Sequence, residues 1–342
     1  MKKMNITSIL REYEEITIRY DSDTAAIWCY FNPKIRPSFT MKMLQEMYDL
    51  QLSVIEYFQT NDMQPEVPIR YFIIASQTSG VFNYGGDLNL FSQLITNKKR
   101  QELYDYAKMC IDTIYLNALN LNLPITTIAL IEGTALGGGF EAALSSDILI
   151  AEEGVKMGLP EIRFNLFPGM GAYSLLARSL GKKEAEEIIT SGKIYDAQTL
   201  HEKGVVTILA KPKKAKEALD EFIKGDAKSF NGMQAIRNAR HRYEHLEYAE
   251  LLDITKIWVD AALRLEPKDL KVMNKLTKIQ SIKSNNTVIK ARTKQDRRIA
   301  TKTISYPFLY NKQLITSDRR EHSDRRGLSL LSDKKTQDTT NS

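Results

Sequence analysis

Two hydrophobic, strand-like segments each run into a glycine-rich turn and then into a helical pattern. The first is IRYFIIAS, residues 69–76, followed by the loop QTSGVFNYGGD. The second is TTIALIEG, residues 126–133, followed by ALGGGFEAAL, residues 135–144. Short apolar runs bounded by turn residues are typical of buried strands, and a repeated order of strand, turn and helix predicts an α/β fold.

The rest of the chain fits the same class. Strands are predicted at 15–21, 24–31, 147–153 and 205–210, and helices at 39–58 and 98–121. The helical pattern continues through residues 211–282, and the sequence then becomes polar and basic. We therefore predict a core at 1–210, a helical cap or oligomerisation region at 211–282, and a basic tail at 283–342.

The positive charge of the chain is concentrated in that tail. The whole chain carries +6, but residues 283–342 hold fourteen Lys/Arg and six Asp/Glu, which leaves −2 for residues 1–282. A nucleic-acid partner is therefore not expected for the main domain. The tail either binds a polyanion, such as an acidic carrier protein, nucleic acid or anionic lipid, or is a solvated extension.

The sequence indicates a cytoplasmic globular protein. Hydrophobic residues make up 43% of the chain and charged residues 26%, and no apolar run reaches the roughly 18 to 20 residues that span a bilayer. The N-terminus turns acidic where a signal peptide would continue apolar. Cys29 and Cys110 lie in apolar segments without metal-ligand spacing, so we predict buried thiols and no metal site. The chain has neither a Walker A sequence nor a GxGxxG motif, and no cofactor is expected.

The two glycine turns have the composition of an anion site. The first free amides of the helix that opens near Gly138 point outward at its positive end, and the amide of Gly86 in FNYGGDL is placed to reach the same point. Each turn alone is equally consistent with a plain loop. Two converging amides would form an oxyanion hole, which stabilises negative charge on a reacting oxygen.

A pair of carboxylates accompanies these turns. Glu141 lies one turn into the helix that the glycines open, and Glu161 follows Pro160 in MGLPEIRFNLFPGMG. A single glutamate at a helix start usually caps the helix. Two carboxylates beside one oxyanion site, in contrast, provide a group that abstracts a proton and a group that donates one.

These motifs occur together in a recognisable order. FNYGGDL, IEGTALGGGFEAALSSDILIAEE, MGLPEIRFNLFPGMGAYSLLARSLG and SGKIYDAQTLHEKGVV resemble the enoyl-CoA hydratase/isomerase (crotonase) superfamily, over roughly residues 12–282. MGLPE, FNLFPGMGAY, the phenylalanine before Glu141 and IWVDAALRLEPKDL resemble its diffusible signal factor (DSF) synthase branch. The resemblance implies a ββα superhelix with a C-terminal helical region, catalytic Glu141 and Glu161, and oxyanion amides on Gly86 and Gly138.

The DSF synthase resemblance also implies a reaction. It would be dehydration of a 3-hydroxyacyl-carrier-protein and thioester hydrolysis, releasing a cis-2-unsaturated fatty acid used in quorum sensing. NPKIRPSFT and NYGG replace patterns usual in CoA-using hydratases, which favours acyl carrier protein as the partner. The alternatives are a CoA-dependent enoyl-CoA hydratase or isomerase of fatty-acid metabolism, and a crotonase-like protein that binds the receiver domain of a sensor kinase. The resemblance implies a homotrimer.

An acyl chain requires an apolar tunnel. The candidates are Leu136, Gly137 and Met170 beside the motifs, with Trp258 and Leu276 on the C-terminal helices. Plain core packing explains each of them equally well. Asp87, Glu132 and Asp147 are expected to cap helices or form pairs, and the four histidines lie outside every motif.

Overall fold

A computed structural model describes residues 4–65 and 67–277, and the backbone of 308–310 and 313–315. Contacts divide the chain into two units, Met1–Ser284 and Asn285–Ser342. The second unit contributes an antiparallel pair of short strands, β11 (Phe308–Tyr310) and β12 (Gln313–Ile315). All other elements belong to the first unit. The predicted tail otherwise lies outside the described residues.

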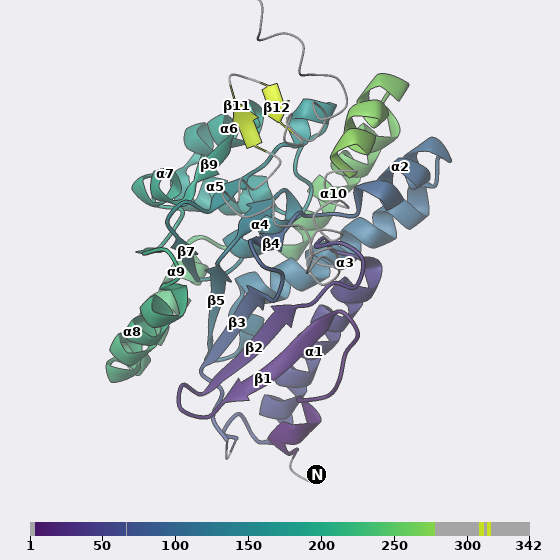
Figure 1. Cartoon of the computed structure of the whole chain (residues 1–342). Coiled ribbons are helices and arrows are strands. Elements are labelled where there is room, and N and C mark those ends of the chain that lie inside the picture. Colours follow the sequence, from purple (N-terminus) through teal and green to yellow (C-terminus); the bar gives the residue numbers. More distant parts are fainter. Residues whose placement is uncertain (1–3, 66, 278–307, 311–312, 316–342) are drawn as a thin grey trace, which may run out of the picture. The chain divides into compact units, whose positions relative to one another are not determined.

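The first unit is built on a six-stranded sheet with the order β1-β2-β3-β5-β7-β10 (Figure 1). β1 and β2 are antiparallel, and every other neighbouring pair is parallel. Parallel neighbours need crossover connections, which the helices supply. The strands are β1 (Ile16–Asp21), β2 (Ala26–Phe31), β3 (Tyr71–Ser76), β5 (Thr126–Ile131), β7 (Ile148–Glu152) and β10 (Ile208–Ala210).

Helices cover both faces of this sheet. Along β3, Phe72 and Ile74 join the core beneath α1 (Met41–Thr60) and α3 (Arg100–Ala118), whereas Tyr71 and Ile73 join a second cluster with α8 (Ala215–Lys228). Side chains alternate between the faces of a strand, so an uninterrupted apolar strand supplies both clusters. This explains why the central strands are recognisable in the sequence.

Four short strands form a second sheet with the order β4-β6-β8-β9. β4, β6 and β8 directly follow β3, β5 and β7 along the chain, so each repeat contributes one strand to each sheet before its helix. This is the predicted ββα superhelix. The sequence interpretation placed β4 in a loop and did not predict β6, β8 or β9, because three residues are too few to show an alternating pattern. They are β4 (Val81–Asn83), β6 (Thr134–Leu136), β8 (Lys156–Gly158) and β9 (Ile194–Asp196).

One predicted helix has different bounds. The helix expected at 98–121 is α3, and it is preceded by a separate helix, α2 (Leu88–Thr96). Lys98 has a left-handed φ of 53°, which a continuous α-helix does not accommodate. The predicted thiols of Cys29 and Cys110 are buried and free. None of the helices in the described part is long and apolar enough to cross a membrane.

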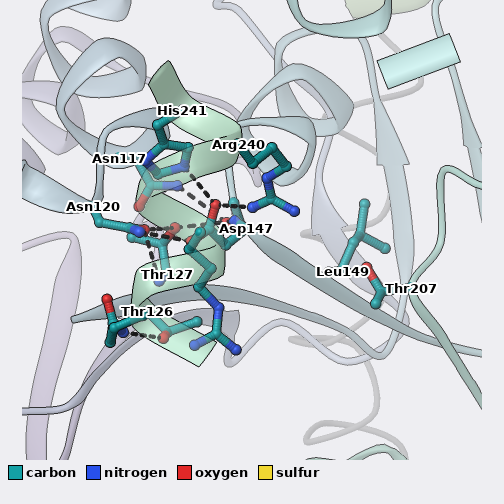
Figure 2. A network of polar contacts seen from close by, with 12 residues as sticks. Asn117, Asn120, Thr126, Thr127, Asp147, Leu149, Thr207, Arg240 and His241 are labelled. Atoms are coloured by element: carbon teal, nitrogen blue, oxygen red, sulfur yellow. Dashed lines mark hydrogen bonds and ion pairs between the residues drawn. The ribbon is translucent and has the colours of Figure 1, made fainter. Parts of the chain in front are cut away.

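The C-terminal region is helical, as predicted. It contains α8, α9 (Phe230–Tyr243) and α10 (Tyr248–Leu263). α9 is attached by polar side chains: Arg240 and His241 both contact Oδ1 of the buried Asp147, with a His241 Nε2 to Oδ1 distance of 2.8 Å (Figure 2). α9 is therefore held at the start of β7 by charge and hydrogen bonding, and its first residue, Phe230, packs edge-on against the ring of Tyr71.

Candidate active site

The first glycine turn joins β4 to α2. Gly85 has a φ of 85°, in the left-handed region that favours glycine. Its N–H donates to Oδ1 of Asn83 at 2.7 Å, and its carbonyl accepts from the N–H of Phe39 at 2.8 Å. In a trans peptide the C=O and N–H point in opposite directions. The N–H of Gly86 therefore points away from Phe39.

The second glycine turn joins β6 to α4 (Gly138–Leu144). The carbonyl of Gly137 accepts from the N–H groups of Phe140 at 2.8 Å and Glu141 at 3.0 Å. The N–H of Gly138, in the same peptide unit, therefore points out of the helix N-terminus. Gly137 itself has a φ of 52°, which again favours glycine.

The two turns are in contact. A Cβ built on Gly85 would lie 2.6 Å from the nitrogen of Gly138, and one built on Gly138 would lie 3.4 Å from the nitrogen of Gly86. Within residues 4–65 and 67–277, neither Gly86 nor Gly138 donates its N–H to a protein acceptor. Two unpaired amides thus lie side by side at the positive end of α4, as an anion-binding site requires.

Glu141 lies on the first turn of α4, the helix that begins at Gly138. Its side chain is buried, and Oε1 accepts hydrogen bonds from the N–H groups of Met170 at 2.7 Å and Ala172 at 3.0 Å. Burial raises the pKa of Glu141 to about 7, against the opposing effect of these two hydrogen bonds. The carboxyl therefore changes its charge near neutral pH.

Glu161 lies on the other side of the second turn, at the start of the 3-10 helix Glu161–Phe164. A Cβ built on Gly137 would lie 2.5 Å from its Oε1, while Oε2 is buried and has no hydrogen-bond partner among the described residues. Burial, and then the charge of Glu141, raise the pKa of Glu161 well above its usual value. Neighbouring buried carboxyls resist double ionisation, so the pair shares a proton.

The predicted substrate-binding residues fall into two groups. Leu136, Gly137 and Met170 surround the amide pair; the sulfur of Met170 would lie 2.3 Å from a Cβ on Gly138. Trp258 is only 5% exposed and packs against Gly169 and the ring of Phe91. Leu276 packs against the main core. The last two positions are consistent with core packing, and a role in binding an acyl chain stays a prediction.

Several contacts at the site were not predicted from the sequence. Asn83 and Phe39 fix the first turn, and the ring of Phe91 would lie 2.6 Å from a Cβ on Gly86. An asparagine two residues before a glycine is a known turn signal and could have indicated Asn83. The expected helix cap at Asp87 and the pairing of Asp147 are both present. No group of three or more metal-ligating side chains occurs among the described residues.

Comparison with known proteins identifies the family. The family profile described as enoyl-CoA hydratase/isomerase matches residues 31–251. The chain belongs to the enoyl-CoA hydratase/isomerase family. Mouse mitochondrial methylglutaconyl-CoA hydratase is 33% identical over 152 residues, covering 42% of this chain and 44% of that protein. A probable mitochondrial enoyl-CoA hydratase 2 from Arabidopsis thaliana is 35% identical over 153 residues, covering 45% and 48%. The matches therefore span less than half the length of these curated relatives.

Solved structures of the family share the fold. An enoyl-CoA hydratase from Mycobacterium avium subsp. paratuberculosis superposes with a TM-score of 0.62 at 18% identity, covering 79% of this chain and 98% of that one. Pseudomonas aeruginosa DspI gives a TM-score of 0.57 at 22% identity, covering 71% and 92%. At these identities the likeness concerns the fold, and it confirms the predicted crotonase-type superhelix.

Proposed function

We propose that this family member interconverts 3-hydroxyacyl and 2-enoyl thioesters, with Glu141 and Glu161 as its acid/base pair and Gly86 and Gly138 as its oxyanion hole. The observation that carries the proposal is the arrangement of the buried carboxyl of Glu141 and the partly buried carboxyl of Glu161 around two adjacent, unpaired amides. Neither component alone indicates this chemistry. Together they provide proton transfer next to a site that stabilises a thioester enolate.

The reaction first requires stabilisation of negative charge on the thioester oxygen, which the oxyanion hole provides. The thioester oxygen accepts hydrogen bonds from Gly86 and Gly138, and negative charge grows on it as the proton on C2 is removed. Each donor that is already in place before the reaction typically lowers the free energy of the transition state by about 3 to 4 kcal/mol. The dipole of α4 adds to the same stabilisation, because its N-terminus faces the oxygen.

The different environments of the two carboxyls suggest their roles. Two N–H groups stabilise the carboxylate form of Glu141, whereas Glu161 lacks a partner on Oε2 and is repelled by Glu141. The shared proton therefore resides on Glu161 in the resting pair. During hydration, Glu141 takes a proton from the water that adds to C3, and Glu161 donates its proton to C2. Dehydration follows the reverse path, with both protons returned.

A more specific function follows from the DSF synthase motifs. Dehydration of a 3-hydroxyacyl-carrier-protein would be followed by hydrolysis of the resulting 2-enoyl thioester at the same oxyanion hole. A glutamate would take a proton from water, the new C–O bond would replace C–S, and the carrier thiol would leave with a proton. The free cis-2-unsaturated acid is the product. Phe140 before Glu141 and the FNLFPGMGAY segment support this version.

A second candidate has support of its own. The curated relatives at 33–35% identity are named as CoA hydratases. Their names favour a CoA thioester as the substrate and hydration without release of a free acid. The acid/base pair and the oxyanion hole would act identically on either carrier. A homotrimer and binding to a sensor-kinase receiver domain also remain predictions.

One set of assays separates these possibilities. The purified protein is incubated with matched 3-hydroxyacyl-carrier-protein and 3-hydroxyacyl-CoA, and enoyl thioester and free acid are measured by mass spectrometry. We expect dehydration of at least one substrate, with free acid from the carrier-protein substrate if the more specific function holds. Glu141→Gln and Glu161→Gln should each lower turnover by at least 10²-fold.

The control variant is Glu153→Gln, which removes an exposed carboxyl at the end of β7. It should retain wild-type turnover. Wild-type rates in either active-site variant would contradict the assignment of the pair, and no conversion of either thioester would contradict the proposed function.

A further inference from the structure

Asn83 occupies the last position of β4, at the base of the oxyanion turn. Its side chain is fully buried, with Oδ1 2.7 Å from the nitrogen of Gly85. A peptide N–H can only donate, so the oxygen of this amide side chain must face Gly85. The other atom, Nδ2, is buried and has no hydrogen-bond partner among the described residues. The contact with Gly85 is therefore the one hydrogen bond that this side chain makes there.

Three backbone groups on either side of the Gly86 N–H have hydrogen-bond partners. The Gly85 N–H is bound by Asn83, and the Gly85 carbonyl by the N–H of Phe39. On the far side, the N–H of Asp87 donates to the hydroxyl of Tyr106 at 3.2 Å. Within the described residues, the N–H of Gly86 is the donor that this turn leaves unpaired. The tethers thus define the direction in which that donor points.

Asn83 also touches the second turn. A Cβ built on Gly139 would lie 2.2 Å from the carbonyl oxygen of Asn83 and 3.0 Å from its Cβ. Gly139 is the second residue of α4, next to Gly138. One residue therefore binds the peptide next to the first amide through its side chain and packs against the helix that carries the second.

We propose that Asn83 is a positioning residue of the oxyanion hole, which keeps the N–H of Gly86 available beside that of Gly138. This inference rests on the proposed function, since it assumes that the amides bind a thioester oxygen. Gly85 tolerates many backbone conformations because it lacks a Cβ. Without the Asn83 oxygen, the peptide between Tyr84 and Gly85 loses this tether. The next peptide, which carries the Gly86 N–H, is then held only through the Gly85 carbonyl and can turn with the backbone of Gly85.

The consequence for catalysis is a loss in kcat rather than in binding. Complete removal of an oxyanion donor typically lowers kcat by about 10² to 10³-fold. A donor that is misaligned for part of the time should cost less, so Asn83→Ala is expected to lower kcat by about 10 to 100-fold with KM changed less than about threefold. Asn83→Ser restores an oxygen that can accept from the N–H two residues later, and should recover most of this loss.

A matched control separates positioning from general destabilisation. Asn61 is also buried and its amide donates to the carbonyls of Tyr57 and Met4, at the end of α1 and the N-terminus. Asn61→Ala removes an asparagine of comparable burial outside the glycine turns. It should lower the melting temperature while leaving kcat within about twofold of wild type.

A second readout tests the inference without turnover. With ¹⁵N-glycine labelling, the amide resonance of Gly86 should shift or broaden in Asn83→Ala and return toward its wild-type position in Asn83→Ser, whereas Gly225 on α8 should not change. An unchanged Gly86 resonance, an unchanged kcat in Asn83→Ala, or equal loss in the Ala and Ser variants would overturn the role of Asn83. If the wild-type protein converts no thioester, the proposed function fails, and the Gly86 resonance alone decides whether Asn83 orients the turn.

Discussion

Replacing Glu141 by glutamine should make the protein more stable at alkaline pH while removing its activity. Glutamine has nearly the same shape, and its side-chain oxygen can still accept from the N–H groups of Met170 and Ala172, which bind Oε1 of Glu141 at 2.7 and 3.0 Å. The variant lacks only the titratable charge. Any pH-dependent difference in stability therefore reports the cost of ionising a buried carboxyl.

The size and sign of the effect follow from the pKa. Burial raises the pKa of Glu141 from 4.5 to about 7, so the folded state binds the proton more tightly than the unfolded state does. The stability that the folded state gains by binding this proton is fully present below pH 4.5 and is lost as the pH rises through about 7. Above about pH 7, this pKa difference lowers the free energy of unfolding of the wild-type protein by about 3 kcal/mol. Relief of the repulsion on Glu161 acts in the same direction.

Urea unfolding at two pH values measures the difference. At about pH 8, Glu141→Gln should be more stable than wild type by about 2 to 3 kcal/mol, and at about pH 4.5 the two proteins should be nearly equal. Glu153→Gln, at an exposed position, should follow wild type at both pH values. A Glu141→Gln variant that is less stable at both pH values, or a difference that does not depend on pH, would refute the reasoning.

Three further predictions concern the same region. Gly137→Ala should cost about 1 to 3 kcal/mol and most of the turnover, because its φ is 52° and its Cβ would lie 2.5 Å from Oε1 of Glu161, whereas Gly225→Ala in open space on α8 should raise the melting temperature. Turnover in the hydration direction should fall as the pH drops below about 7, because Glu141 becomes protonated and no longer accepts a proton; a pH–rate profile without this fall would contradict its role as base. Burial opposes ionisation of Asp147, but its partners on α9 hold its pKa below 3.8. The ionised side chain therefore stabilises the folded state at neutral pH, and this stabilisation is lost as the pH falls. Asp147→Asn should lower the free energy of unfolding by about 3 kcal/mol at neutral pH and by progressively less in acid.

The parts predicted well from the sequence are those determined by local pattern. β3 and β5 are uninterrupted apolar runs because both of their faces are covered by helices. The start of α4 follows from the glycine cluster at 137–139, and its spacing places Glu141 on the first turn. These features depend on side chains within a few positions of each other, so one sequence is sufficient to indicate them.

The parts that were missed depend on contacts between distant segments. β4 and β6 are strands because they pair with each other, and their three residues carry no pattern of their own. The hydrogen bond from Phe39 to Gly85 connects the loop after β2 to the oxyanion turn. Likewise, the partners of Glu141 lie 29 and 31 positions further along the chain. Local propensity contains no information on such pairings.

The position of Glu141 depends on both ends of a helix only seven residues long. At the C-terminal end, Ser145 accepts a hydrogen bond from Asn117 at 2.9 Å, and Asp147 accepts one from Asn120 at 2.6 Å (Figure 2). At the N-terminal end, the helix contacts Asn83 and the first glycine turn. The polar network around Asp147 thus fixes the C-terminal end of this helix, and the first glycine turn contacts its N-terminal end. Loss of the network should displace Glu141 and reduce turnover although no member of the network belongs to the glycine turns.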